Sequence, residues 1–349
     1  IDACAVFAGV LIQRCPQVRL LATSREEFGS PGEQIFRVSP LGLPPDDAPL
    51  PDLELYPSVQ LFLARARRAR PDFDLRGRNG AVLVDICRRL DGIPLAIELA
   101  AARVKVLSPE QIAERLQDCF SLLAVGPRTA MPRHQTLRAA MDWSYDLLSK
   151  AERALLRRLA VFSGGWTLGA AEQVAGFGEV NEPAVLDLLT QLVDKSLVSA
   201  DPAGSVMRYG MLETVRQYGR NRLRDSGETG ETRHRHADYF IRIAGHADQG
   251  LREAKQIESL ALLDAEHDNI RAALGWSIEA GEADIALNLV GNMGWFWFMR
   301  GHWEESWRWL TRAMELDPGG DPASRAWAIT RAGGLQLIRG NLVDTIELV

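Results

Sequence analysis

Hydrophobic residues recur every three or four positions along most of the chain, which is the period of an amphipathic helix. The pattern is clearest in residues 58–125, where Val59, Phe62 and Leu63 fall on one face together with Ala66. From residue 232 onward we find only helix. Further helical patterns cover residues 135–148, 150–161, 168–175, 183–195 and 212–224. The sequence therefore predicts a mainly α fold.

Two short segments near the start of the chain have a strand pattern instead. Residues 18–25 read as a buried strand that ends in polar residues, after a helix that Pro16 stops. Residues 34–38 alternate like a second strand. Residues 1–41 thus carry an α/β signature, and the proline- and aspartate-rich residues 42–57 mark a domain boundary.

Local signals place helix ends within the predicted helical domain, residues 42–125. Asn79 begins a helix that Asp91-Gly92 ends, and Pro94 suits the first turn of the next helix. Ser108 and Gln111 have the spacing of a capping box.

Residues 126–228 combine helices with a small hairpin. Residues 197–199 and 207–209 predict its two strands, with a turn at residues 201–204. Helices, a hairpin and a closing helix match the plan of a winged helix.

An internal repeat lies in residues 229–349. Residues 299–307 align with residues 338–346, and a weaker copy of the same turn occurs at residues 280–286. Each copy has a glycine where two helices meet. We expect an incomplete array of helical pairs similar to TPR repeats, which bury their apolar faces by stacking.

The composition narrows the class of protein. A length of 349 residues predicts two to four domains, and a net charge of −6 gives no electrostatic reason for non-specific binding to nucleic acid. The four cysteines are far apart, as expected for free thiols in a reducing cytosol. No apolar run reaches the roughly 20 residues that cross a bilayer, so we expect a cytoplasmic protein without a membrane partner. Because the chain begins at Ile1, we expect it to be a fragment.

Residues 20–26 bear the first resemblance to a known family. They resemble the sensor-1 strand of STAND NTPases with an NB-ARC-like domain, and more narrowly the AfsR/LuxR-type bacterial transcriptional regulators. The resemblance makes residues 1–41 the C-terminal remnant of a P-loop α/β NTPase domain. It also implies that Arg25 contacts the terminal phosphate of a nucleotide, a contact that suits a planar guanidinium.

Residues 91–100 give the most specific match, because they resemble the GxP motif of the STAND helical domain. The resemblance implies that Pro94 packs against adenine while neighbouring backbone holds the nucleotide, so the predicted site comprises Gly92, Ile93, Pro94 and Leu95. A plain alternative remains: a glycine that ends one helix and a proline that starts the next.

A third family motif, Met-His-Asp in the winged helix, has an altered counterpart here. Met211 matches, but Leu212 replaces the histidine that touches the phosphate of ADP, and Glu213 replaces the aspartate. Leucine has no hydrogen-bond donor. The resemblance therefore does not carry the ADP-locking contact to this chain.

The phosphate-binding motifs of the family are absent from this sequence. It contains neither GxxxxGK[ST] nor an apolar strand ending in paired acidic residues. We therefore expect no ATP hydrolysis by the chain as given, although its parent protein would be an ATPase candidate. The resemblance implies ATP or ADP as the cofactor, with Mg²⁺ held by residues upstream of Ile1, and no tight nucleotide binding by this fragment.

Two residue clusters have plainer explanations. The arginines of residues 65–70 suit a solvated helix face balanced by acidic neighbours better than a nucleic-acid contact. The tryptophans at helical spacing suit inter-repeat packing better than a ligand cage; they are Trp295, Trp297, Trp303, Trp307 and Trp309.

Three functional hypotheses follow. The first is a nucleotide-dependent switch of a transcriptional regulator that self-associates on activation, with an inducer or protein partner on the TPR-like arm and DNA contacted only by an effector domain outside this chain. The second is an activator whose own winged helix binds DNA through residues 183–195, or a TPR-type scaffold without nucleotide control. Asp187 and Asp194 make that helix a poor match for phosphates. The third, an enzyme, has no acid–base pair, nucleophile or metal constellation behind it.

Overall fold

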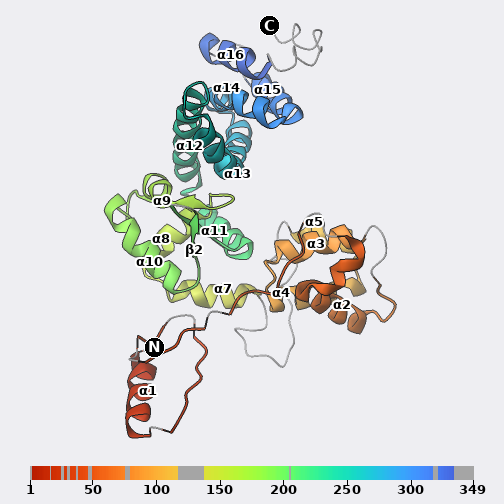
Figure 1. The fold of residues 1–349 in the computed structure, drawn as a ribbon, viewed down its shortest axis with the longest axis vertical. Helices are drawn as coiled ribbons and strands as arrows, with labels where there is room; N and C mark the ends of the chain where they lie inside the picture. Colours follow the sequence, from red (N-terminus) through yellow and green to blue (C-terminus); the bar gives the residue numbers. More distant parts are fainter. Residues whose placement is uncertain are drawn as a thin grey trace. The chain divides into compact units, whose positions relative to one another are not determined.

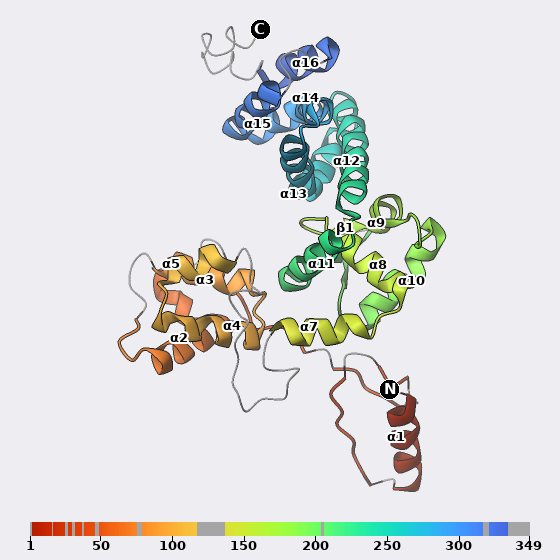
Figure 2. The ribbon, with the colours of Figure 1, turned by 180° about the vertical axis from the view of Figure 1, so that it is seen from behind.

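The computed structural model of the protein forms two compact units (Figures 1 and 2). The first contains residues 1–157, 187–199 and 211–221, and the second contains residues 158–186, 200–210 and 222–349. The structure describes residues 2–15, 17–24, 27–29, 32–36, 38–45, 49–74, 79–116, 137–203, 206–316 and 321–333. Each unit is described by itself below.

Helices make up the regular structure of the first unit. They are α1 (Asp2–Arg14), the 3₁₀ helix η1 (Leu50–Leu55), α2 (Pro57–Ala69), α3 (Asn79–Arg89), α4 (Pro94–Ala101), the 3₁₀ helix η2 (Ala102–Lys105), α5 (Pro109–Arg115), α7 (Leu137–Asp146), and most of α8 (Lys150–Leu159), α10 (Val185–Asp194) and α11 (Glu213–Asp225). The prediction of a mainly α fold is confirmed.

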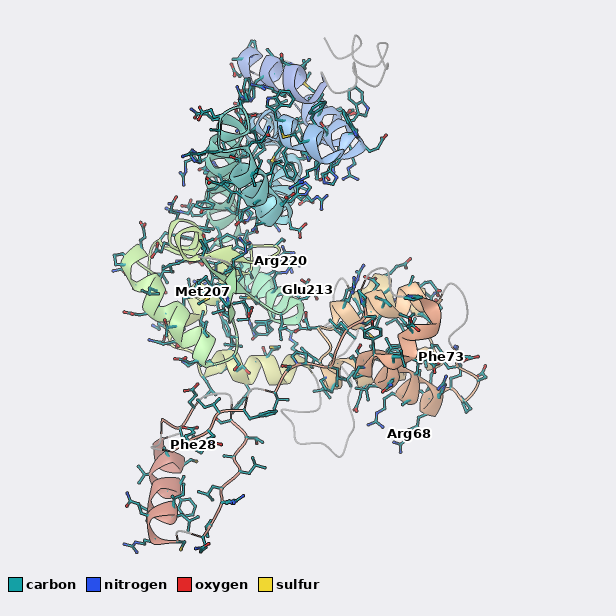
Figure 3. All side chains as sticks on the ribbon, viewed as in Figure 1. Phe28, Arg68, Phe73, Met207, Glu213 and Arg220 are labelled. Atoms are coloured by element: carbon teal, nitrogen blue, oxygen red, sulfur yellow. The ribbon has the colours of Figure 1, made fainter. Side chains whose placement is uncertain are left out.

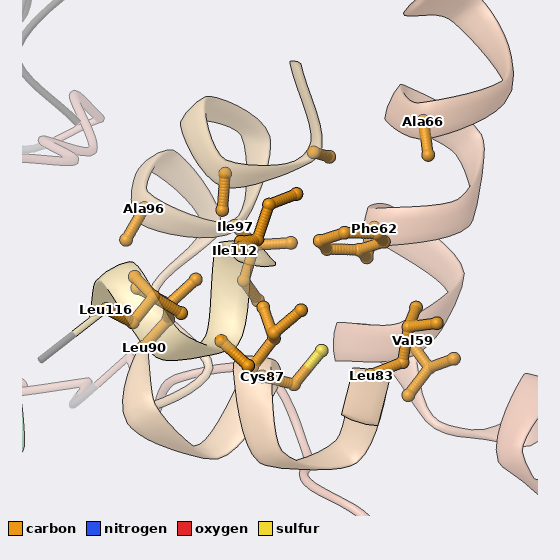
Figure 4. Close-up of a cluster of buried hydrophobic side chains, with 14 of the residues drawn as sticks. Val59, Phe62, Ala66, Leu83, Cys87, Leu90, Ala96, Ile97, Ile112 and Leu116 are labelled. Atoms are coloured by element: carbon orange, nitrogen blue, oxygen red, sulfur yellow. The ribbon is translucent and has the colours of Figure 1, made fainter. Parts of the chain in front are cut away.

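Helices α2 to α5 enclose a hydrophobic core, and we call residues 57–116 the helical module. The predicted stripe of α2 is buried in it: Phe62 is 0% exposed and Leu63 2%. Opposite them lie Leu83 and Cys87 of α3 (Figure 4). Other core residues include Val59, Ala66, Ile86, Leu90, Ala96, Ile97, Ala100, Ile112 and Leu116. Burial of this apolar face holds the module together.

The predicted helix boundaries in the module are largely correct. Pro94 is the first residue of α4, and the Ser108 side chain accepts a hydrogen bond from the Gln111 amide while the Gln111 side chain accepts one from the Ser108 amide. Helix α4 ends at Ala101, and the chain continues from Ala102 as the 3₁₀ helix η2.

The arginines of residues 65–70 lie mostly beside acidic side chains. Arg65 donates to Glu98 at 2.8 Å, and Arg67 lies 3.4 Å from Glu54. Arg68 is exposed, and its side chain points away from the module (Figure 3). The solvated, charge-balanced face is therefore confirmed.

The prediction of two strands before residue 41 is wrong. Residues 17–24 and 32–36 form no strand, and Leu21 and Phe36 are 99% and 87% exposed. A strand needs a neighbouring strand to accept its backbone hydrogen bonds, and the described residues place none beside either segment. Apolar alternation therefore did not suffice to form a strand here.

The strands of the structure form one small sheet. Its order is β1 (Trp166–Thr167), β3 (Val206–Gly210) and β2 (Ser199–Ala203), and Trp166 of β1 pairs antiparallel with Tyr209 of β3. The predicted hairpin exists, but its first strand lies later than expected: residues 201–203, assigned to the turn, belong to β2. Strand β1 was not predicted, because two residues carry no periodic signal.

Helix α9 (Leu168–Ala175) follows β1, and the Thr167 side chain caps it by accepting a hydrogen bond from the Ala170 amide. The 3₁₀ helix η5 (Glu182–Ala184) leads into α10. The order α8, α9, α10, hairpin and α11 is that of a helix-turn-helix with an appended wing.

Long helices form the rest of the second unit, which we call the helical arm. They are α12 (Thr229–Leu251), α13 (Gln256–Ala280), α14 (Ala283–Arg300), α15 (Trp303–Leu316), α16 (Pro322–Ala328) and the short π-helix η6 (Ile329–Gly333) (Figure 1). No described helix is both long enough and apolar enough to span a membrane.

Two turns of the arm have the same hydrogen-bonding pattern. Gly281 and Gly301 both adopt left-handed conformations, with φ of 78° and 71°, after α13 and α14. In each turn the next residue donates its amide to the carbonyl five positions earlier, as in a Schellman cap. The predicted turn glycines are confirmed here, whereas the third copy, residues 338–346, lies outside the described residues. Of the five tryptophans, Trp297 (0% exposed) and Trp309 (8%) are buried as expected, whereas Trp295, Trp303 and Trp307 are half-buried.

Candidate functional site

The GxP turn lies between α3 and α4 in the helical module. Gly92 has φ of 66° and its carbonyl accepts a hydrogen bond from the Leu41 amide at 3.0 Å. A Cβ on Gly92 would lie 2.3 Å from the Leu41 carbonyl oxygen, so no side chain fits there. Glycine is therefore required by both the backbone conformation and the close approach of Leu41.

Pro94, the residue predicted to pack against adenine, is accessible. Pro94 is exposed at the first position of α4, while Ile93, the residue before it, and Leu95 are half-buried. A proline at this position leaves no backbone N–H without a partner. Because Pro94 is exposed, its ring is available to a flat ligand. Arg25, the predicted phosphate contact, lies outside the described residues.

Asp91 connects this turn to the start of α11. One carboxylate oxygen accepts a hydrogen bond from the Glu213 amide at 2.9 Å. The other accepts from the Thr214 amide at 2.9 Å and from the Thr214 hydroxyl at 3.1 Å. We call this set of three hydrogen bonds the Asp91 latch.

The latch joins an anion to the positive end of a helix. The first amides of a helix have no partner within it, so a carboxylate stabilises them, as it does in a helix N-cap. Burial raises the pKa of Asp91 above its usual value, although the hydrogen bonds from Thr214 and Glu213 oppose this shift. Asp91 also has φ of 52°, a left-handed conformation that aspartate adopts more readily than most residues other than glycine.

Further along α11, two side chains contact other parts of the first unit. Gln217 donates to the Leu116 carbonyl at 3.3 Å. Tyr218 is 5% exposed within the core of the helical module, and its hydroxyl lies 2.7 Å from a carboxylate oxygen of Asp142. The Asp91 latch therefore belongs to a packed contact and not to an isolated surface pair.

The altered family motif directly precedes the latch. Leu212 is 39% exposed, whereas the Glu213 carboxylate accepts hydrogen bonds from Arg216 at 2.7 Å and from Gln217 at 3.2 Å. Leu212 has no polar atom beyond its backbone, and Glu213 is engaged within its own helix. The contact to the GxP turn is made instead by the backbone amides of residues 213 and 214 and by the Thr214 hydroxyl.

Sequence reasoning missed Asp91 as a functional residue. It treated the aspartate as part of an ordinary helix end. The sequence contained one signal, an aspartate at the end of a helix where glycine or asparagine is usual. In the structure this aspartate and the next residue, Gly92, are both left-handed.

The expected DNA-reading helix has an acidic surface. Asp187 and Asp194 of α10 are exposed, and residues 185–194 contain no lysine or arginine. Lys195, just beyond the helix, forms an ion pair with the buried Glu152. This helix therefore offers no cation for a DNA phosphate.

The described residues contain no group of side chains suited to hold a metal ion. Cys4, Cys15 and Cys87 are free thiols, and burial raises the pKa of Cys87 to about 12. A buried thiol with so high a pKa is unreactive. Cys119 lies outside the described residues.

Comparison with known proteins identifies one domain. Residues 148–224 match the family model of the winged helix-turn-helix domain. This part of the chain is a winged-helix domain. Its match begins just before α8 and ends within α11, so it includes the amides that bind Asp91. The predicted boundaries, residues 126–228, contain the matched segment.

Several mycobacterial proteins are similar over much longer stretches. The chain is 44% identical over 315 residues to "Putative HTH-type transcriptional regulator Mb0914c" of Mycobacterium bovis and to a similarly named protein, Rv0890c, of Mycobacterium tuberculosis. The match covers 90% of this chain but 34% of each relative. "Uncharacterized protein Rv0894" of M. tuberculosis is 43% identical over 229 residues, which are 65% of this chain and 56% of that protein. This chain thus spans about a third of the length of the relatives named as regulators.

Proposed function

We propose that this chain is the regulatory part of a bacterial transcriptional regulator, in which an adenine nucleotide controls the winged-helix domain. The similarity to relatives named as HTH-type regulators supports the transcriptional role. The Asp91 latch is the observation that supports nucleotide control, because it links the GxP turn directly to the start of α11.

The residues present suit the adenine end of a nucleotide. Pro94 offers an exposed apolar face, and Arg25 is the proposed phosphate contact. The Gly92 carbonyl, by contrast, is occupied by the Leu41 amide. Since the sequence lacks a phosphate-binding loop, the remaining phosphate and Mg²⁺ contacts are proposed to come from other parts of the regulator.

The switch requires that nucleotide and latch influence each other. Pro94 lies three residues after Asp91 in the same turn, so a base packed on the proline would act on the backbone that positions the carboxylate. A ligand shifts such an equilibrium only by binding one state better than the other. We propose that one nucleotide state favours the closed latch and the other releases α11.

Nucleotide titration of the natural full-length regulator tests this function. Replacing Pro94 or Arg25 with alanine is expected to weaken the binding of a fluorescent ADP analogue about tenfold or more. Pro57→Ala is the matched control, because Pro57 is also an exposed proline at the first position of a helix. Unchanged affinity in both site variants would exclude the proposed nucleotide site.

The helical arm is proposed to bind an inducer or a protein partner. Its two identically bonded turns at Gly281 and Gly301 support the proposal that α13 to α15 stack as TPR-like repeats. Partner binding to the arm would then favour release of the latch and self-association of the regulator.

Direct DNA binding by the winged-helix domain is the second candidate, favoured by the family match of residues 148–224. The acidic α10 argues against it, and we propose that DNA is contacted by an effector domain outside this chain. A mobility-shift assay with the 349-residue chain separates the two candidates. Two results would show that the acidic charge of α10 does not prevent DNA binding: retardation of DNA that Asp187→Ala abolishes, or retardation that increases with added salt. The absence of a shift at low salt supports the regulatory role.

A further inference from the structure

A short loop of the winged-helix domain, residues 162–166, packs against α12 and α13 within the second unit. Asn269 of α13 is 0% exposed and lies at the centre of this contact. Its amide oxygen accepts a hydrogen bond from the Ser163 amide at 2.7 Å, and its amide nitrogen donates to the Gly165 carbonyl at 2.8 Å. One side chain of the arm thus binds both a donor and an acceptor of the loop backbone.

Asn269 is held in this orientation by a neighbouring residue. Its amide nitrogen also donates to the Glu266 carboxylate at 2.8 Å, so both of its N–H groups have acceptors. Glu266 is 5% exposed and accepts a hydrogen bond from Arg208 of β3 at 2.5 Å. The polar network therefore extends from the loop through α13 to the wing, with its buried charges paired.

The loop backbone approaches its neighbours too closely to admit side chains. Gly165 has φ of 92°, and a Cβ on it would lie 2.8 Å from the Tyr209 carbonyl oxygen of β3. A Cβ on Gly164 would lie 3.2 Å from side-chain atoms of Asp268 in α13. The two glycines let the loop fit between the sheet and α13.

Aromatic rings fill the space beside this network. Phe162 stacks on Trp166 with ring centroids 5.3 Å apart, and it meets His236 and Phe240 of α12 edge-on at 5.2 and 6.3 Å. Trp166 and Phe240 are 1% and 0% exposed. The contact consequently has a buried aromatic centre beside the hydrogen bonds of Asn269.

A second polar contact fixes the start of α12. Arg158 is 1% exposed and donates to the Glu228 carboxylate at 2.7 and 3.2 Å. Glu228 is the N-cap residue of α12. The same guanidinium donates to the Phe177 carbonyl at 2.6 Å and lies 3.6 Å from the centroid of the Phe177 ring. Two separate elements of the winged-helix domain are therefore joined to the arm.

We infer that residues 162–166 and Asn269 form a coupling joint that makes the wing and helices α12 and α13 a single rigid body. A flexible linker would leave polar groups to water, whereas this contact buries Asn269 with its amide oxygen and both N–H groups hydrogen-bonded, so bending at the joint would break several bonds at once. The joint gives the arm a mechanical role: a displacement of α12 or α13 by a bound partner moves β1 and β3 with it. This inference does not depend on nucleotide binding.

Hydrogen exchange of the 349-residue chain tests the coupling joint. In the wild type, the amides of Thr167, Arg208 and Tyr209 are expected to exchange only when α13 also opens. Asn269→Ala leaves buried loop groups without partners, so these amides should exchange at least about tenfold faster while those of α14 change little. Asn288→Ala is the matched control, because Asn288 of α14 donates to the Asp284 carbonyl at 2.8 Å and to the Ser324 hydroxyl at 3.4 Å, and neither group belongs to the joint.

The outcomes separate a coupling joint from an ordinary contact. Faster exchange confined to the sheet and to residues 163–165 supports the joint. Unchanged sheet protection, or equal loss of protection throughout the arm, overturns it. If Asn269→Ala does not fold, Arg208→Gln, which removes only the partly exposed end of the network, must show the same localised effect.

Discussion

The helical module and the leading segment (the described residues of 2–38) contain similar apolar residues in very different environments. In the module Phe62 is 0% exposed, whereas in the leading segment Phe7 and Phe36 are 67% and 87% exposed. The module brings several helices to one core, while most large apolar side chains among the described residues of the leading segment are exposed, as Val6, Leu21 and Val38 are. A hydrophobic pattern therefore specifies a structure only when a second apolar surface is present for it to pack against.

Thiol reactivity should show the largest difference between the two regions. Cys4 and Cys15 of α1 are exposed, whereas Cys87 is buried in the module with its pKa raised from 9.0 to about 12. At the same pH, a rise of this size leaves Cys87 with about a thousandfold less of the reactive thiolate. In a Cys119→Ser background, a colorimetric thiol reagent is expected to modify two thiols rapidly and the third only in denaturant. Rapid modification of all three would mean that the module core opens readily.

Paired phenylalanine substitutions measure the difference in stability. Phe62→Ala should lower the free energy of unfolding by about 3–5 kcal/mol, because it removes a buried ring and leaves a cavity. Phe36→Ala should change it by no more than about 0.5 kcal/mol. Urea denaturation followed by circular dichroism measures both. Similar costs for the two substitutions would show that the leading segment is packed in solution.

The Asp91 latch extends the comparison beyond the module. Asp91→Ala should reduce stability by about 1–3 kcal/mol, because the amides of Glu213 and Thr214 lose a buried acceptor. These two amides should also exchange faster with solvent. Asp85→Ala, in the preceding helix α3, is the control: Asp85 pairs with Arg89 at the surface, and its replacement should cost at most about 0.5 kcal/mol. Equal effects of the two variants would remove the case for the latch.

A smaller effect concerns pH. Since burial raises the pKa of Asp91 in the folded protein above 3.8, the folded state holds this proton more tightly than the unfolded state. As pH rises from 3.8 through the folded-state pKa, the contribution of Asp91 to stability must fall. Asp91→Asn should remove that slope from the wild-type curve of unfolding free energy against pH. Wild-type and Asp91→Asn curves that run parallel within this window would contradict the assigned pKa direction.

Local signals in the sequence predicted the helices well. The stripe of α2 and the capping box at Ser108 depend on residues a few positions apart, and both are present. The structure has another such box before α8, where the Ser149 amide lies 2.7 Å from Glu152. Such features are decided by neighbouring residues, so periodicity and spacing suffice to find them.

Long-range partners decided what the sequence did not reveal. The segments at residues 18–25 and 34–38 have a strand pattern but no adjoining strand among the described residues. Asp91 and Thr214 are 123 positions apart, so no local pattern connects them. Of the candidate site, the turn at Gly92 and the start of α4 at Pro94 were predictable, whereas the contact with α11 was not. Nucleotide binding by these residues and by Arg25 stays a prediction.

Gly92 has one further consequence, for tolerance to genetic change. Its backbone meets the Leu41 carbonyl so closely that even alanine would push residues 38–45 away from the turn. A library of all single replacements, selected for folded protein, should lose every variant at position 92, while the exposed position 94 accepts many. Deep sequencing of such a library would thus distinguish a position kept for the architecture of the turn from one kept for a ligand.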